Sequence, residues 1–225
     1  LRRPASVRSP PQATTARRHG EDRPDDAGSV LPNAVVVALA GGLVGSVLGW
    51  VAMPSFFRLL SDNPNVVDLG TSYARWRFVG VASMAATAAC KAFYDGIGRT
   101  YLHLIAAVAM NIVNAAFCWL LIFGHWGFPQ MGIAGAGVAA CASSWVGFFV
   151  MMAFTLRPED LRHYRFYRRG ALSLTMMRHL VRLSVPGGIA TMAVMTGFLI
   201  FTKVVGKIDD AAIAAGAAAS YNGAA

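Results

Sequence analysis

Residues 100–156 read TYLHLIAAVAMNIVNAAFCWLLIFGHWGFPQMGIAGAGVAACASSWVGFFVMMAFTL, and none of these 57 side chains is Asp, Glu, Lys or Arg. A bilayer core of ~30 Å needs ~20 apolar residues of α-helix, so this stretch is long enough for two membrane crossings. The interruption GHWGFP at 124–129 has the glycine, proline and aromatic content of a turn at a membrane–water interface. The stretch therefore predicts an integral membrane protein.

The composition of the whole chain agrees with this prediction. Of its 225 residues, 56% are hydrophobic and 14% are charged, as in a protein that crosses the membrane several times. The net charge of +9 does not indicate nucleic-acid binding, because the charges lie almost wholly between apolar blocks and not on a basic soluble surface. We expect the lipid bilayer, and no nucleic acid, among its partners.

Five apolar segments predict five transmembrane helices, and hence an all-α polytopic membrane bundle. They are 30–57, 78–98, 101–123, 130–156 and 183–202. A last alanine-rich piece could begin a sixth crossing, but it is too short to finish one.

Lys and Arg alternate in number between the segments that join these helices. Alternate segments together hold fifteen on one side of the membrane and five on the other. The positive-inside rule therefore places 1–29 and 157–182 in the cytoplasm of a cell whose plasma membrane the protein crosses. We expect 30–156 to form four helices of one membrane body, 157–182 to be a cytoplasmic linker, and 183–225 to begin a second body.

Two local patterns predict how these segments pack. Gly41, Gly45 and Gly49 recur on one face of the first helix, and similar rows of Gly, Ala and Ser follow in 130–156, so these faces should lie close to neighbouring helices. The linker alternates arginines with aromatic residues around Tyr164, a composition expected to lie against an anionic inner leaflet.

Lys91 and Asp95 are the opposite charges within a predicted crossing, and their i, i+4 spacing puts them on one helix face. Ionisable residues inside a membrane are costly and suggest function. Arg99 marks the nearby cytoplasmic end, so both groups can reach water by snorkelling. We interpret them as a structural or gating pair near the inner mouth, in preference to direct contact with substrate or ion. His103, close by in the sequence, is expected simply to be solvated at a helix end.

Four further residues are candidates for a substrate or ion pathway. Asn111 and Asn114 lie one turn apart on the third predicted helix, and either line a central cavity or form interhelical hydrogen bonds. Thr191 and Met195 would offer a soft, polarizable surface to a lipophilic cation, or else are ordinary lipid-facing residues.

The sequence shows no HExxH or GxSxG motif, no clustered acids, and only three isolated cysteines. We therefore expect no enzyme, no catalytic residue, no metal site and no cofactor.

Five motifs occur in order along the chain. They are TTARRHG (14–20), YDGIGRT (94–100), NIVN with LLIFG (111–124), GFPQMGIAGAG (127–137) and LSVPGG (183–188). These resemble, respectively, the loop before the third helix, the Q-G-x-G-x-T turn after the fourth, the fifth helix, the start of the sixth and the entry of the seventh in the multidrug and toxic compound extrusion (MATE) transporters. The resemblance covers roughly residues 14–219.

This resemblance implies a fold of twelve helices in two six-helix lobes, of which the chain would hold helices three to seven. It also implies a secondary active antiporter that exports xenobiotic or cationic amphipathic small molecules in exchange for H⁺ or Na⁺. The chain departs from the family at two coupling acids. Cys118 stands where the fifth helix often has Asp, and Val194 lies near where one sodium-coupled branch has Glu.

Three alternatives stay open at this point. The chain could belong to a lipid-linked oligosaccharide flippase of the same superfamily, although apart from Lys91 its predicted helices lack the basic residues such cavities use. It could be a non-transporting membrane fragment of a split or truncated gene. A second polypeptide could supply the helices that the two-lobe fold requires.

Overall fold

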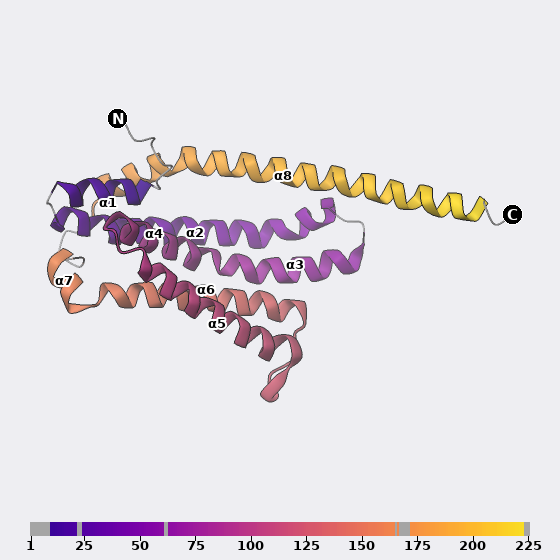
Figure 1. Cartoon of the computed structure of the whole chain (residues 1–225), viewed down its shortest axis with the longest axis horizontal. Helices are drawn as coiled ribbons and strands as arrows, with labels where there is room; N and C mark the ends of the chain where they lie inside the picture. Colours follow the sequence, from indigo (N-terminus) through magenta and orange to yellow (C-terminus); the bar gives the residue numbers. More distant parts are fainter. Residues whose placement is uncertain (1–9, 22–23, 61–62, 165, 167–171, 223–225) are drawn as a thin grey trace. The chain divides into compact units, whose positions relative to one another are not determined.

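The computed structural model describes residues 10–21, 24–60, 63–164, 166 and 172–222, and within them every regular element is helical (Figure 1). The elements are α1 (Pro10–Gly20), α2 (Pro24–Leu60), α3 (Pro64–Val79), α4 (Val81–Gly96), α5 (Tyr101–Phe123), the 3₁₀ helix η1 (His125–Gly127), α6 (Ile133–Thr155), α7 (Pro158–Tyr164) and α8 (Leu174–Asn222). The chain divides into two compact units, Leu1–Val181 and Arg182–Ala225. The predicted all-α class is confirmed.

Four of the described helices contain a stretch that is long and apolar enough to cross a membrane. These stretches are Ala27–Leu59, Tyr101–Phe123, Ile133–Thr155 and Leu174–Phe201. They correspond to the first, third, fourth and fifth expected crossings, with ends that differ by up to nine residues from the predicted ones. The protein is thus a multi-pass membrane protein.

The second expected crossing, 78–98, does not form one helix by itself, because its first residues belong to a helix that begins at Pro64. Asn63 caps this start by accepting a hydrogen bond from the backbone N–H two residues ahead, at 3.0 Å. α3 ends at Gly80 and α4 follows at once. Each of the two helices has 16 residues, so neither is long enough to cross alone. Charged residues of α3 hid this helix from the hydropathy pattern.

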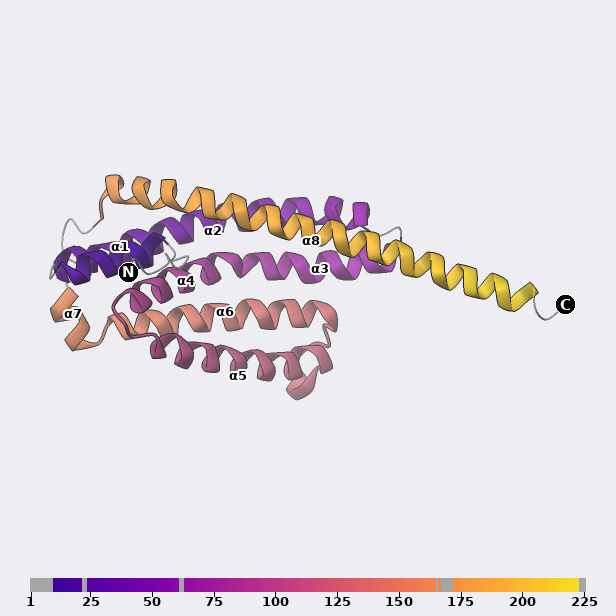
Figure 2. The same cartoon turned by 45° about the horizontal axis from the view of Figure 1, so that its top comes forward.

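α3 and α4 run one after the other, antiparallel to α2 (Figure 2). Gly49 of α2 faces the ring of Phe78, and one turn earlier Ser46 donates a hydrogen bond to the Phe78 carbonyl at 2.6 Å. One further turn back, a Cβ on Gly42 would lie 2.5 Å from the Cα of Ala82. Small residues therefore let the two chain segments touch through their backbones.

The predicted glycine row of the first helix is right at Gly49, which packs against Phe78, but wrong at Gly41 and Gly45. A Cβ on Gly41 would meet nothing within 4 Å, and a Cβ on Gly45 would lie 3.9 Å from its nearest neighbour. The face that packs passes through Gly42, Ser46 and Gly49 instead. The every-fourth-residue pattern identified the helix but not its buried side.

The hairpin of α5 and α6 agrees with the predicted turn at 124–129. α5 ends at Gly124, whose φ of 72° is the left-handed conformation that favours glycine at a helix C-terminus. In α6, Cβ atoms on Gly135 and Gly137 would lie 2.7 and 2.8 Å from the carbonyl oxygens of Leu121 and Tyr73. Gly135, which belongs to the predicted small-residue rows, thus packs against α5 as expected, and Gly137 outside those rows packs against α3.

Two aromatic residues of the linker, Tyr164 and Phe166, are buried in the first unit and do not face outward. Tyr164 and Phe166 are 3% and 1% exposed, and their rings lie 5.5 and 5.4 Å from that of Phe93 on α4. The expectation that these rings lie against the lipid is therefore wrong, because an aromatic cluster was available to bury them. The arginines at 165, 168 and 169 lie outside the described residues.

Two other local expectations also differ from the structure. The motif TTARRHG, which resembles a loop, is part of helix α1, and its Thr15 is fully buried against Gly96. The motif LSVPGG, which resembles the entry of a helix, lies well inside α8 together with its Pro186. A proline within an apolar helix is tolerated where it removes a single backbone bond.

Candidate functional site

Lys91 and Asp95 form an ion pair on α4, with 2.5 Å between the Nζ and Oδ2 atoms. Both come from the last turns of the helix, and the i, i+4 spacing brings them together as the sequence predicts. The Asp95 side chain is 12% exposed and that of Lys91 is 42% exposed. The carboxylate is therefore held inside the bundle while the ammonium reaches outward.

His103 on α5 adds a third ionisable group to this pair. Its ring interacts electrostatically with both Lys91 and Asp95. Its Nδ1 atom is buried without a hydrogen-bond partner among the described residues. The expectation that His103 is simply solvated is therefore wrong. We call Lys91, Asp95 and His103 the α4–α5 triad.

The tight turn between α4 and α5 creates this triad. Gly98 has a φ of 80°, and the N–H of Arg99 donates to the Tyr94 carbonyl at 2.8 Å, which closes the end of α4. α5 then starts at Tyr101. The last turn of α4 and the first turn of α5 consequently face one another, which is the signal that could have placed His103 beside Asp95.

The triad is a cluster of three ionisable side chains. It combines an ammonium, a carboxylate and an imidazole, and imidazole is the side chain that titrates near neutral pH. No group of three His, Cys, Asp or Glu residues is placed to hold a metal ion among the residues that the structure describes.

A second ion pair, between Arg99 and Asp160, was missed by the sequence analysis. The Arg99 guanidinium donates to Oδ1 of Asp160, whose side chain is 2% exposed. The other carboxylate oxygen, Oδ2, and the hydroxyl of Tyr94 are both buried without a hydrogen-bond partner in the described part of the chain. This pair joins the α4–α5 turn to α7 in the linker. The partners are 61 positions apart in the sequence, which left no sequence signal for the pair.

Asn111 and Asn114 have different partners. Asn114 on α5 donates from Nδ2 to the Ser143 hydroxyl on α6 at 3.3 Å, which is an interhelical hydrogen bond. Asn111 donates to the Ala107 carbonyl of its own helix at 2.8 Å, and its side chain is exposed. The structure thus does not bring the two amides to one partner, and a role in lining a cavity stays a prediction for both.

Thr191 and Met195 belong to the second unit. The Thr191 hydroxyl donates to the Gly187 carbonyl at 3.0 Å within α8, and Met195 is 62% exposed. Their predicted part in a substrate pathway stays a prediction.

An apolar groove of about 470 Å³ lies along the first unit, lined by residues of α2, α3, α4 and α6. Trp50 and Trp145 are among the side chains that line it. Its single hydroxyl side chain, Ser46, is already bonded to backbone carbonyls. The groove is therefore suited to an apolar or aromatic-faced occupant.

Comparisons with known proteins agree on one family. The family model described as MatE matches residues 7–120. The multidrug resistance protein PmpM of Pseudomonas aeruginosa is 26% identical over 204 residues, covering 90% of this chain and 43% of that protein. The probable multidrug resistance protein NorM of Rhizobium meliloti is 30% identical over 185 residues, covering 80% and 38%.

Solved structures share the fold. A multidrug resistance MATE family transporter in an inward-facing conformation matches with a TM-score of 0.64 and 20% identity, over 79% of this chain and 39% of the other. An outward-facing conformation matches with a TM-score of 0.70 and 20% identity, over 81% and 40%. The chain spans about two fifths of the length of the relatives and structures it matches.

Proposed function

The chain belongs to the MatE family, and from this premise we propose that it forms part of a secondary active transporter that exports small xenobiotic or cationic amphipathic molecules. The names of the relatives, multidrug resistance proteins, support this substrate class. Because the chain spans about two fifths of their length, transport requires the remaining helices. They come from the same polypeptide or from a second one.

The observation that carries the proposal is the α4–α5 triad. A carboxylate that is 12% exposed in an apolar bundle is costly unless it is paired. Protonation of Asp95 would remove its charge and weaken its hold on the Lys91 ammonium. The lysine side chain would then turn toward water, and the last turns of α4 would lose the ion pair between Lys91 and Asp95. In this mechanism one proton changes the charge and the side-chain arrangement at the end of α4 beside α5, and this change would bias the rocking of one bundle against the other in alternating access.

The triad favours H⁺ over Na⁺ as the coupling ion. The Lys91 ammonium already occupies the position beside Asp95 that a cation would take, at 2.5 Å from the carboxylate oxygen. Sodium would need several oxygen ligands there, whereas the third member of the triad is an imidazole. An imidazole can accept and release a proton without any change of ligand geometry.

We place the triad at the cytoplasmic face of the plasma membrane. The N-terminal segment and the linker 157–182 lie on the side with fifteen of the twenty Lys and Arg residues. The segment 30–156 then supplies helices of the first lobe, and 183–225 begins the second. The α4–α5 turn would open toward the cytosol and the α5–α6 turn toward the outside.

Ethidium export from cells that lack their own multidrug pumps tests the proposal. The chain is expressed together with the helices that complete the two-lobe fold in a relative, and Asp95→Asn is compared with Asp68→Asn, an exposed acid on α3. We expect an uncoupler to abolish export by the unchanged protein. Asp95→Asn should abolish this export as well, and Asp68→Asn should leave it unchanged.

Replacing Na⁺ by K⁺ in the medium should not affect export. Equal export by both variants at equal expression would contradict the role of Asp95. Export that stops without Na⁺ but survives the uncoupler would contradict proton coupling.

A further inference from the structure

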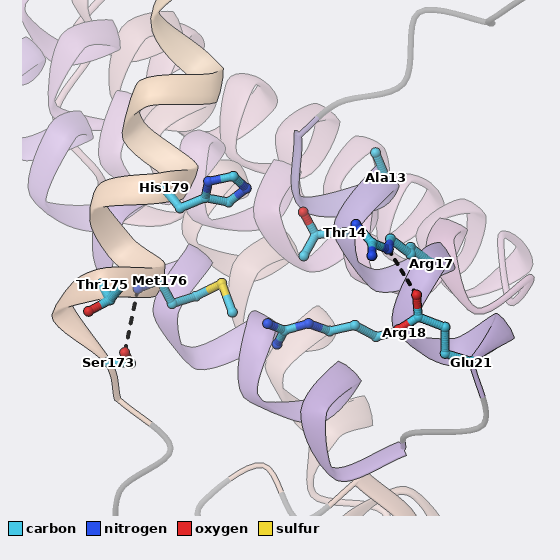
Figure 3. A pocket seen from close by; sticks show the side chains of 9 residues that line it. All are labelled: Ala13, Thr14, Arg17, Arg18, Glu21, Ser173, Thr175, Met176 and His179. Carbon is cyan, nitrogen blue, oxygen red and sulfur yellow. Dashed lines mark hydrogen bonds and ion pairs between the residues drawn. The ribbon is translucent and has the colours of Figure 1, made fainter.

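A polar groove of about 660 Å³ lies between α1 and the first turns of α8, within the first unit (Figure 3). The transport mechanism makes no use of it. The polar side chains lining it that can donate hydrogen bonds are Thr14, Arg17, Arg18, Ser173, Thr175 and His179.

The groove carries more positive than negative charge. Arg17 pairs at 2.9 Å with Glu21, the one acid among the described residues that line the groove, and this pair is exposed to solvent. Arg18 is half-buried and donates to the Ser29 hydroxyl at 3.2 Å, so its side chain is held in place. Figure 3 shows Arg18 extending across the groove toward Met176. A fixed guanidinium next to hydroxyl groups suits the planar, multiple hydrogen bonding of a phosphate.

The position of the groove points to a lipid phosphate. The apolar stretch of α2 starts at Ala27 and that of α8 at Leu174, so α1 and Ser173 lie where these stretches begin. Phospholipid headgroups lie at this depth of a bilayer. The groove also opens beside the apolar Met176, along which an acyl chain can continue.

We propose that this groove binds the phosphate of an anionic phospholipid headgroup, with Arg17 and Arg18 as its main contacts and the hydroxyls of Thr14, Ser173 and Thr175 as donors. The bound lipid would tie α1, at the start of the first unit, to the segment that leads into α8. This site is independent of the α4–α5 triad, and it does not rest on the proposed transport.

Binding of phosphatidylglycerol and of phosphatidylcholine to the detergent-purified full chain tests the proposal by native mass spectrometry. A basic residue near a membrane surface contributes ~1 kcal/mol to anionic lipid binding, so Arg17→Gln and Arg18→Gln should each weaken phosphatidylglycerol binding about fivefold. Arg178→Gln removes an exposed arginine of α8 that does not line the groove. This variant should change the affinity for phosphatidylglycerol less than about twofold. Phosphatidylcholine should bind more weakly than phosphatidylglycerol, and none of the three substitutions should change its binding.

A variant that keeps every charge separates the groove from general electrostatics. Ala13 is exposed and lines the groove, so Ala13→Trp should fill the space and weaken phosphatidylglycerol binding while leaving the arginines intact. This variant and Arg17→Gln also carry the test if Arg18→Gln does not fold, as judged by helical circular dichroism.

Three results would overturn the proposal. They are equal binding of the two lipids, equal effects of Arg17→Gln and Arg178→Gln, and full displacement of phosphatidylglycerol by millimolar inorganic phosphate. The last result would assign the groove to a soluble anion.

Discussion

The α4–α5 turn and the α5–α6 turn use the same backbone device for different chemistry. Each reverses the chain with a glycine at positive φ, 80° at Gly98 and 72° at Gly124. Beside the first turn lie two ion pairs, Lys91 with Asp95 and Arg99 with Asp160. The second turn is surrounded by aromatic rings, with His125 stacked on Trp119 at 4.1 Å and an interplanar angle of 8°.

The two turns therefore differ in what their side chains can do. An uncharged aromatic turn suits a membrane–water interface, where amphipathic rings lie at headgroup level. A turn with buried charges needs fixed partners, and those partners become points at which protonation or motion can act. We infer that the α5–α6 turn anchors the bundle and that the α4–α5 turn carries the chemistry.

The largest expected effect is the loss of Arg99. Arg99→Ala would leave the buried Asp160 carboxylate without its partner, and breaking a buried pair in this way costs about 3–5 kcal/mol. Asp160→Ala should cost less, because the Arg99 side chain is 39% exposed and can turn to water. Thermal unfolding in detergent measures both. If the double variant is no more stable than Arg99→Ala, the pair does not fix the linker as described.

The two turn glycines give an intermediate effect. Gly98→Ala should destabilise by roughly 1–2 kcal/mol, because an L-residue is strained at positive φ. Gly124→Ala should cost more, since its Cβ would also lie 3.1 Å from atoms of Phe128 and Gln130, whereas a Cβ on Gly98 meets nothing within 4 Å. The midpoints of thermal unfolding of the two variants measure these two losses of stability. Equal losses would mean that the α5–α6 turn relaxes around the added methyl group.

The smallest effect on stability, and the sharpest on function, concerns the two histidines. His103→Gln should lower proton-driven ethidium export severalfold and flatten its pH dependence, because it removes the imidazole of the triad. His125→Gln should leave export unchanged and cost about 0.5–1.5 kcal/mol through the lost ring stacking. The same pH profile in both variants would remove His103 from the mechanism.

Local patterns in the sequence predicted the features that depend on near neighbours. The uncharged run at 100–156 gave α5, α6 and the turn between them, and i, i+4 spacing gave the contact of Lys91 with Asp95. Each of these depends on hydropathy or on one helical repeat. The family resemblance was likewise confirmed, because its motifs are short and ordered along the chain.

The features that were missed depend on contacts between distant segments. Asp160 looks exposed in the sequence, yet it is buried by Arg99, 61 residues away. Tyr164 and Phe166 have the composition of an interfacial segment, but the ring of Phe93 buries them. The early start of α3 was hidden because its charges lower the hydropathy although capping at Asn63 favours helix.

The orientation of the two turns across the membrane is tested most directly by cysteine labelling. Cys90, Cys118 and Cys141 are first replaced by alanine, and a single cysteine is placed at Gln130 beside the α5–α6 turn or at Glu159 on α7, both exposed positions. We predict that a membrane-impermeant maleimide labels Gln130→Cys in intact cells, and Glu159→Cys only after permeabilisation. Labelling of Glu159→Cys in intact cells, with Gln130→Cys protected, would contradict the account.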